Sequence, residues 1–142
     1  MANRQFNQFN YDLEKGLVRI YARVAIGATG APTLTIATNS GNPSNGIASV
    51  TRSAAGKYVF TFGATGSTQT NLDTYQRIIF CNANIINSTI STVVSTQISV
   101  EAVTTVTAPA ITIQCLAAAG TAVDPNSGDV LLVEFVLKNA TV

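Results

Sequence analysis

The sequence predicts an all-β fold: a single antiparallel β-sandwich or barrel-like domain of about 7–9 short strands with an N-terminal arm. β-Branched residues dominate, apolar and polar residues alternate with period two, and clusters of turn-forming residues separate the runs. The chain has 142 residues, enough for one domain with a real core. We therefore divide it into an arm over residues 1–16 and an all-β domain over residues 17–142.

The arm has two alternative conformations. Residues Phe6, Phe9 and Leu13 have helical spacing, so a short helix around Phe6–Lys15 is one alternative. An extended arm is the other, and we favour it.

The first expected strand covers residues 17–26 and separates its side chains cleanly into two faces. One face is apolar and consists of Val18, Ile20, Ala22, Val24 and Ile26. The opposite face carries Arg19, Tyr21 and Arg23, so this strand is expected to be half-buried. Gly27, Gly30 and Pro32 then end it.

A hairpin is expected over residues 46–62, because a short glycine-containing connection at 54–56 joins two alternating runs. Tyr58, Phe60 and Phe62 share one face of its second strand and are expected in the core. Turn-rich composition predicts loops over 38–46, 63–74 and 120–129.

The remaining strand-like runs cover 33–37, 75–87, parts of 88–108, and 110–117. A last strand closes the chain over 130–142. Its apolar face consists of Leu131, Val133, Phe135 and Leu137, whereas Glu134 and Lys138 point the other way.

Composition bounds the function. The formal net charge is +1 and only 11% of the residues are charged. Such a balance argues against a nucleic-acid binder, which needs a basic surface, and against an ordinary soluble enzyme. Uncharged polar surfaces suit a protein that a partner covers, because burying charges is costly.

The residues for chemistry are scarce. Histidine is absent and the seven acids are scattered, so we expect no enzyme, no catalytic or metal site and no cofactor. Asp124 and Asp129 flank a turn and are expected to serve it. Cys81 and Cys115 are expected to be buried thiols of a reducing cytoplasm, although their pairing stays open.

Targeting segments are not expected either. The opening MANRQFNQFN lacks the apolar core of a secretory signal. No run reaches the ~18 apolar residues of a membrane helix, so we expect no contact with a membrane.

Three pieces of the sequence carry a resemblance. They are MANRQFNQFNYDLEKGLVRIYARVAIGATGAPTL, GIASVTRSAAGKYVFTF and DPNSGDVLLVEFVLKNATV. Together they resemble small structural virion proteins of tailed bacteriophages, of the decoration or cement type. These motifs are not catalytic, so they indicate a lineage rather than a chemistry.

The resemblance implies a protein of the capsid exterior, assembled in the host cytoplasm, that stabilises the head by bridging capsid subunits. Its implied partners are the major capsid protein and further copies of itself, as a homotrimer. The expected interface comprises aromatic and arginine residues of the arm and of the first strand: Arg4, Phe6, Phe9, Tyr11, Arg19, Tyr21 and Arg23.

Two alternatives stay open. The first is a tail, neck or head-fibre component of the virion, which the copy number per particle would distinguish. The second is a carbohydrate-binding β-sandwich module, although the chain has no Trp for a stacking platform.

Overall fold

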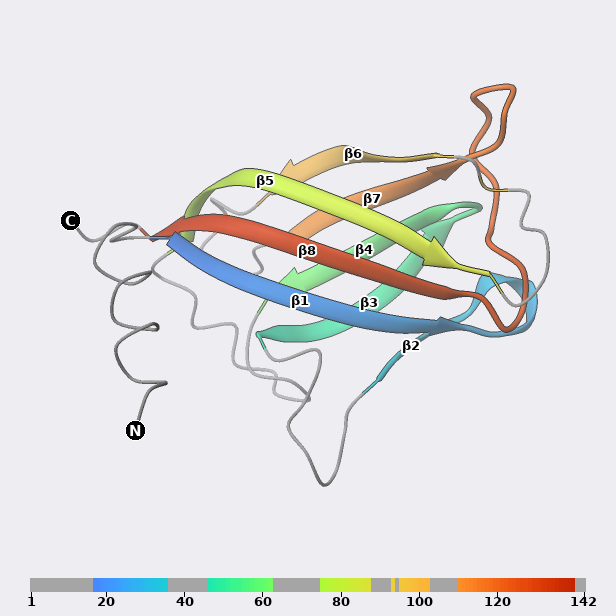
Figure 1. Cartoon of the computed structure of the whole chain (residues 1–142), viewed down its shortest axis with the longest axis horizontal. Helices are drawn as coiled ribbons and strands as arrows, with labels where there is room; N and C mark the ends of the chain where they lie inside the picture. The colour runs from blue at the N-terminus through green and yellow to red at the C-terminus, as the bar shows by residue number, and fades with distance from the viewer. Residues whose placement is uncertain are drawn as a thin grey trace, which may run out of the picture.

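The chain folds into a β-sandwich, which confirms the predicted fold class (Figure 1). The computed structural model describes residues 17–35, 46–62, 75–87, 93, 95–102 and 110–139. Among these residues, eight strands form two four-stranded antiparallel sheets. The strands are β1 (Leu17–Ile26), β2 (Pro32–Leu34), β3 (Ile47–Ala54), β4 (Lys57–Phe62), β5 (Tyr75–Ile86), β6 (Ser95–Ala102), β7 (Ala110–Leu116) and β8 (Val130–Asn139).

The first sheet, here the β8 sheet, has the strand order β2-β1-β8-β5. Its central strand β8 pairs with β1 from Leu17↔Lys138 to Ala25↔Val130, and with β5 on its other side. The alternation predicted for the first strand is confirmed, because Ile20, Ala22, Val24 and Ile26 are buried. The side chain of Val18 lies outside the described residues.

The second sheet, here the β7 sheet, has the order β3-β4-β7-β6. The predicted hairpin over 46–62 is confirmed as β3 and β4. Its turn passes through Gly56 at φ +67°, a left-handed conformation that glycine adopts without steric cost.

The core lies between the two sheets. Phe60 and Phe62 of the β7 sheet each contact Phe135 of the β8 sheet edge-to-face, with ring centroids 5.4 and 5.2 Å apart. The predicted inward residues Tyr58 and Leu131 are buried as well. Period-two alternation on facing strands thus produces one continuous apolar layer.

Some segments differ from the expectation or lie beyond the described residues. The strand expected at 33–37 is Pro32–Leu34, and of the region 88–108 the structure describes a strand over Ser95–Ala102. The arm (1–16) and the predicted loop at 63–74 lie outside the described residues, as does 38–45 of the loop predicted at 38–46.

Each lateral side of the sandwich presents one edge strand from each sheet. Strands β2 and β3 border one side, and β5 and β6 border the other. On the second side the Thr96 hydroxyl of β6 donates to the Ala83 carbonyl of β5 over 2.8 Å, which links the two sheets.

Candidate interaction surface

The outer face of the β8 sheet brings together three of the predicted interface residues. Arg19, Tyr21 and Arg23 alternate with the buried positions of β1, so their side chains share this face. Tyr21 is 52% exposed, which is high for an aromatic side chain. The other predicted interface residues, Arg4, Phe6, Phe9 and Tyr11, lie outside the described residues.

Glu134 of β8 organises the polar part of this face. It lies directly opposite Tyr21 in the sheet register, and its Oε1 accepts a hydrogen bond from the Tyr21 hydroxyl over 3.2 Å. Arg19 Nη1 approaches the same oxygen at 3.3 Å. The Glu134 carboxylate thereby positions the side chains of both Tyr21 and Arg19 on this face.

A shallow groove of about 360 Å³ crosses the face beside these residues. Tyr21 and Arg23 of β1, Leu132 and Glu134 of β8, and Asn82 and Asn84 of β5 contribute to its lining. Asn84 Nδ2 donates to Asn82 Oδ1 over 3.2 Å, which aligns the two amides along the strand. The groove therefore offers an aromatic ring, an aliphatic floor, and both donors and acceptors.

The sequence placed Arg19, Tyr21, Arg23 and Glu134 on outward positions, but missed Asn82 and Asn84. Alternation within 80–86 was the available signal, because Phe80, Asn82, Asn84 and Ile86 fall on one side. The assembly of these strands into one surface depends on the β5–β8 register, which no local pattern specifies.

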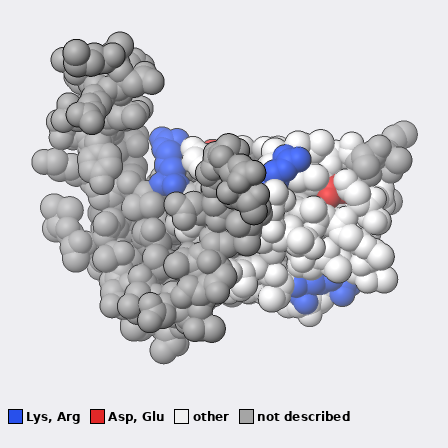
Figure 2. Space-filling model, turned by 90° about the horizontal axis from the view of Figure 1, so that it is seen from below, with Lys and Arg blue, Asp and Glu red and all other residues white. Residues whose placement is uncertain are grey.

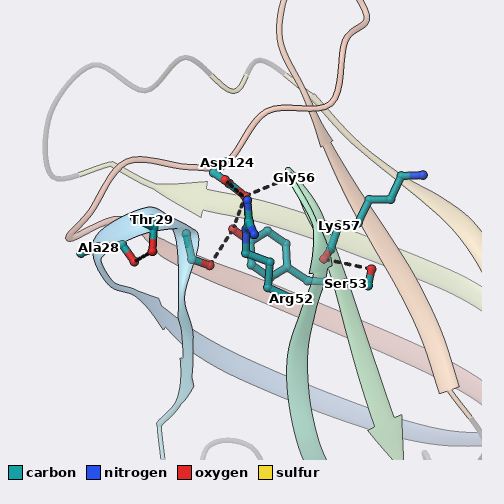
Figure 3. Close-up of polar contacts among 9 residues, drawn as sticks. Ala28, Thr29, Arg52, Ser53, Gly56, Lys57 and Asp124 are labelled. Carbon is teal, nitrogen blue, oxygen red and sulfur yellow. Dashed lines mark hydrogen bonds and ion pairs between the residues drawn. The ribbon is translucent and has the colours of Figure 1, made fainter.

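A second polar cluster lies at one end of the sandwich and centres on Asp124 (Figure 3). Arg52 of β3 binds this carboxylate through two guanidinium nitrogens, with Nε donating to Oδ1 at 2.9 Å and Nη2 to Oδ2 at 2.7 Å. The Gly56 N–H donates to Oδ1 over 2.7 Å. The Tyr58 hydroxyl lies 3.3 Å from Oδ1 and 3.2 Å from the Gly30 carbonyl.

These contacts shift the pKa values of Asp124 and Tyr58 in opposite directions. The hydrogen bond from Arg52 and the Gly56 N–H hold the pKa of Asp124 below its usual value, in spite of partial burial. Burial and the nearby carboxylate raise the pKa of Tyr58, so its hydroxyl stays protonated. The ion pair therefore stabilises the charged forms of both Asp124 and Arg52.

The predicted role in the turn is confirmed for Asp129, whereas Asp124 also bonds to other elements. Asp129 Oδ2 accepts the Asn126 N–H at 2.9 Å, within its own turn. Asp124 instead joins its loop to β3 and to the β3–β4 turn, and its position beside Gly30 brings it to the turn after β1. No local pattern predicts a contact between Arg52 and Asp124, which are 72 positions apart.

The two cysteines are free thiols, and Cys115 is buried as expected, whereas Cys81 is only half-buried. Burial raises the pKa of Cys81 to about 11 and that of Cys115 to about 12. Neither is therefore an activated nucleophile.

The described part of the chain contains neither a metal-binding cluster nor a membrane-spanning helix. Its His, Cys, Asp and Glu residues form no group of three or more that could hold a metal ion. Among the same residues, no helix has the length and hydropathy needed to span a membrane.

Comparison with known proteins gives no relative: no protein-family model, no curated protein and no solved structure matches this chain.

Proposed function

We propose that this protein is a structural virion protein of a tailed phage, a capsid decoration or cement protein that stabilises the head by bridging capsid subunits. The observation that carries the proposal is the outer face of the β8 sheet. It gathers Arg19, Tyr21 and Arg23, residue types that are enriched at protein interfaces, around a shallow groove.

The character of the surface supports the same role. Figure 2 shows few Lys, Arg, Asp or Glu side chains among the described residues of the face in view, as the composition requires. A surface of this kind loses little by being covered, since few charges have to be desolvated. The proposed partner, the major capsid protein, rests on the resemblance of both ends and the centre of the sequence to phage virion proteins.

The first test concerns the arm. Removal of residues 1–12 is expected to weaken attachment to empty capsids while leaving the all-β domain folded, because the buried core that the structure describes begins at Ile20. Co-sedimentation with capsids measures attachment, and circular dichroism checks folding. A truncated protein that binds capsids normally would eliminate the arm as an anchor.

The second test concerns the face. Tyr21→Ala removes an exposed aromatic side chain and is expected to weaken capsid binding roughly tenfold or more, as aromatic anchors at interfaces do. Thr51→Ala is the matched control, because Thr51 is an exposed residue of β3 in the other sheet. Equal binding by both variants would remove this face from the capsid interface.

Copy number separates the decoration role from a tail, neck or head-fibre component. A decoration protein is expected in hundreds of copies per particle, and a tail component in a dozen or fewer, which cryo-electron microscopy of virions counts directly. A low copy number would favour a tail, neck or head-fibre role over capsid decoration.

The groove is a specific reason to test a second candidate, a carbohydrate-binding module. An exposed tyrosine flanked by Asn82, Asn84 and Glu134 provides a stacking surface and hydrogen-bonding groups for sugar hydroxyls. A glycan array measures this. Specific glycan binding that is lost in Tyr21→Ala would favour the module over the virion role.

A further inference from the structure

Strand β5 forms the free edge of the β8 sheet. Within the described residues it pairs with β8 on one side and has no strand of its own sheet on the other. Figure 1 shows β5 along the border of this sheet, above β8. An edge strand presents N–H and C=O groups to any strand that can reach them.

The exposed apolar side chains gather on this side of the molecule. Of the five large apolar side chains that are exposed among the described residues, three lie on β5: Ile79 (56%), Phe80 (51%) and Ile86 (48%). A fourth, Ile98 (39%), lies on β6, the neighbouring edge of the other sheet. Exposed large apolar side chains on two adjacent edge strands favour a surface that a partner covers.

Part of β5 has no charge, proline or bulge of its own that would block pairing at its edge. Natural edges are blocked by charges, prolines or bulges. The β5–β8 register is irregular near 75–77 and 78–80, but it is continuous from Phe80↔Val136 to Ile86↔Val130. The residues of that stretch, FCNANII, include no charge and no proline.

The stretch from Phe80 to Ile86 is self-complementary about Ala83. If a second copy runs antiparallel with Ala83 opposite Ala83, then Asn82 faces Asn84, and Phe80 faces Ile86, each twice. On the inner side, Cys81 faces Ile85. Apolar residues thus meet apolar residues and amides meet amides, which is what a twofold interface requires of a single strand.

We propose that two copies of this chain associate through antiparallel pairing of their β5 strands around Ala83, which joins the two β8 sheets into one eight-stranded sheet. Each exposed Phe80 then packs against an Ile86 of the other copy. The amides of Asn82 and Asn84 have the donors and acceptors to bond across the axis.

The backbone at the centre is compatible with this pairing. The Ala83 carbonyl already accepts the Thr96 hydroxyl over 2.8 Å, so it points away from β8 and toward the edge. A carbonyl oxygen has two lone pairs and can accept the N–H of the facing strand as well. Thr96 reaches it from β6 of the other sheet.

The pairing does not depend on the proposed function. It gives a twofold dimer, whereas the resemblance to decoration proteins implies a trimer, and a mass measurement separates the two.

The experiment places charges at the axis. The full-length protein is expected to sediment at twice its 14.8 kDa mass. Asn82→Lys/Asn84→Lys sets lysines opposite lysines and is expected to raise the dimer dissociation constant at least about tenfold. Both positions are exposed, so the variant is expected to fold, which circular dichroism and urea unfolding check.

The matched control changes the same two positions. Asn82→Lys/Asn84→Asp sets a lysine opposite an aspartate on each side of the axis and is expected to keep the dimer, with a dissociation constant within about threefold of the unmodified protein. Equal weakening by both variants would overturn the register. A monomer or a trimer of the unmodified protein would overturn the pairing altogether, while leaving the capsid role to its own tests.

Discussion

At the scale of single residues, Asp124 is the carboxylate that concentrates the most contacts on the described surface of the fold. Four donor groups, two of Arg52 and one each of Gly56 and Tyr58, converge on it from two strands and the turn between them. Glu134 is also paired with an arginine, but by a single contact of 3.3 Å on an open sheet face. Because the Asp124 pair is bidentate and includes a backbone N–H, we expect it to contribute much more to the free energy of unfolding than the Glu134 pair.

Asp124→Ala is therefore expected to lower the free energy of unfolding at pH 7 by about 1–3 kcal/mol, because the Gly56 N–H and the Arg52 guanidinium lose their acceptor. Urea denaturation measures the change. Glu134→Ala, the matched control, is expected to cost about 1 kcal/mol or less. Similar losses in the two variants would contradict the structural role given to Asp124.

The same variant carries a pH dependence. Because the pKa of Asp124 is lowered in the folded protein, its contribution is complete above the unfolded value of about 3.9 and is lost as the pH falls toward the folded value. The difference in unfolding free energy between the unmodified protein and Asp124→Ala is expected to be constant near neutrality and to narrow below about pH 4. A difference that stays unchanged at pH 3 would count against the ion pair.

At the scale of elements, the β3–β4 turn packs closely against backbone of other segments. A Cβ atom added to Gly56 would lie 2.6 Å from the Val123 nitrogen and 2.8 Å from the Cys115 carbonyl oxygen, both of them backbone atoms. Gly120 also has a positive φ, but a Cβ added there meets nothing within 4 Å. Two glycines of similar conformation thus differ in their surroundings alone.

Gly56→Ala is expected to cost about 2–4 kcal/mol, the sum of the left-handed conformation and of overpacking against backbone that cannot yield. Gly120→Ala is expected to cost about 1 kcal/mol, for the conformation only. Thermal or urea unfolding of both variants separates the two contributions. Equal costs would show that the turn can move away from the 117–129 loop.

The strands themselves were largely predictable, because their alternation is local. The sequence places Ile20 and Val24 on the buried side of β1 and Arg19 and Arg23 on the other, as the structure does. The order of strands in each sheet was not predictable, since it depends on contacts such as β1 with β8 that no short window contains. The outer surface could accordingly be predicted strand by strand, and not as a set of neighbouring residues.

At the scale of the whole molecule, the two sheets form one unit because their aromatic side chains interlock. Phe135 is fully buried and contacts both Phe60 and Phe62 of the opposite sheet. Burial of apolar side chains is the main driving force of folding. Here the Phe135 ring of one sheet packs against two rings of the other and so joins the two sheets.

Phe135→Ala is expected to lower the free energy of unfolding by about 3–5 kcal/mol through lost contacts and an unfilled cavity. Tyr21→Ala, an aromatic truncation on the exposed face, is expected to cost about 1 kcal/mol or less. Far-ultraviolet circular dichroism and tyrosine fluorescence should report one coincident transition in each variant. Separate transitions would mean that the sheets unfold independently.

The position of β8 between β1 and β5 has a consequence for how the protein is made. β1 is synthesised before the other seven described strands, yet from Leu17 to Ala25 it pairs with β8, the last of them. The contact between Arg19 and Glu134, 115 positions apart, illustrates this separation. The nascent chain must therefore carry an apolar strand without its central neighbour until residues 130–139 have been synthesised. The β8 sheet can form only afterwards, through contacts between residues far apart in the sequence, which makes folding slow. Until then, the exposed apolar strand can aggregate with other newly made copies of the chain.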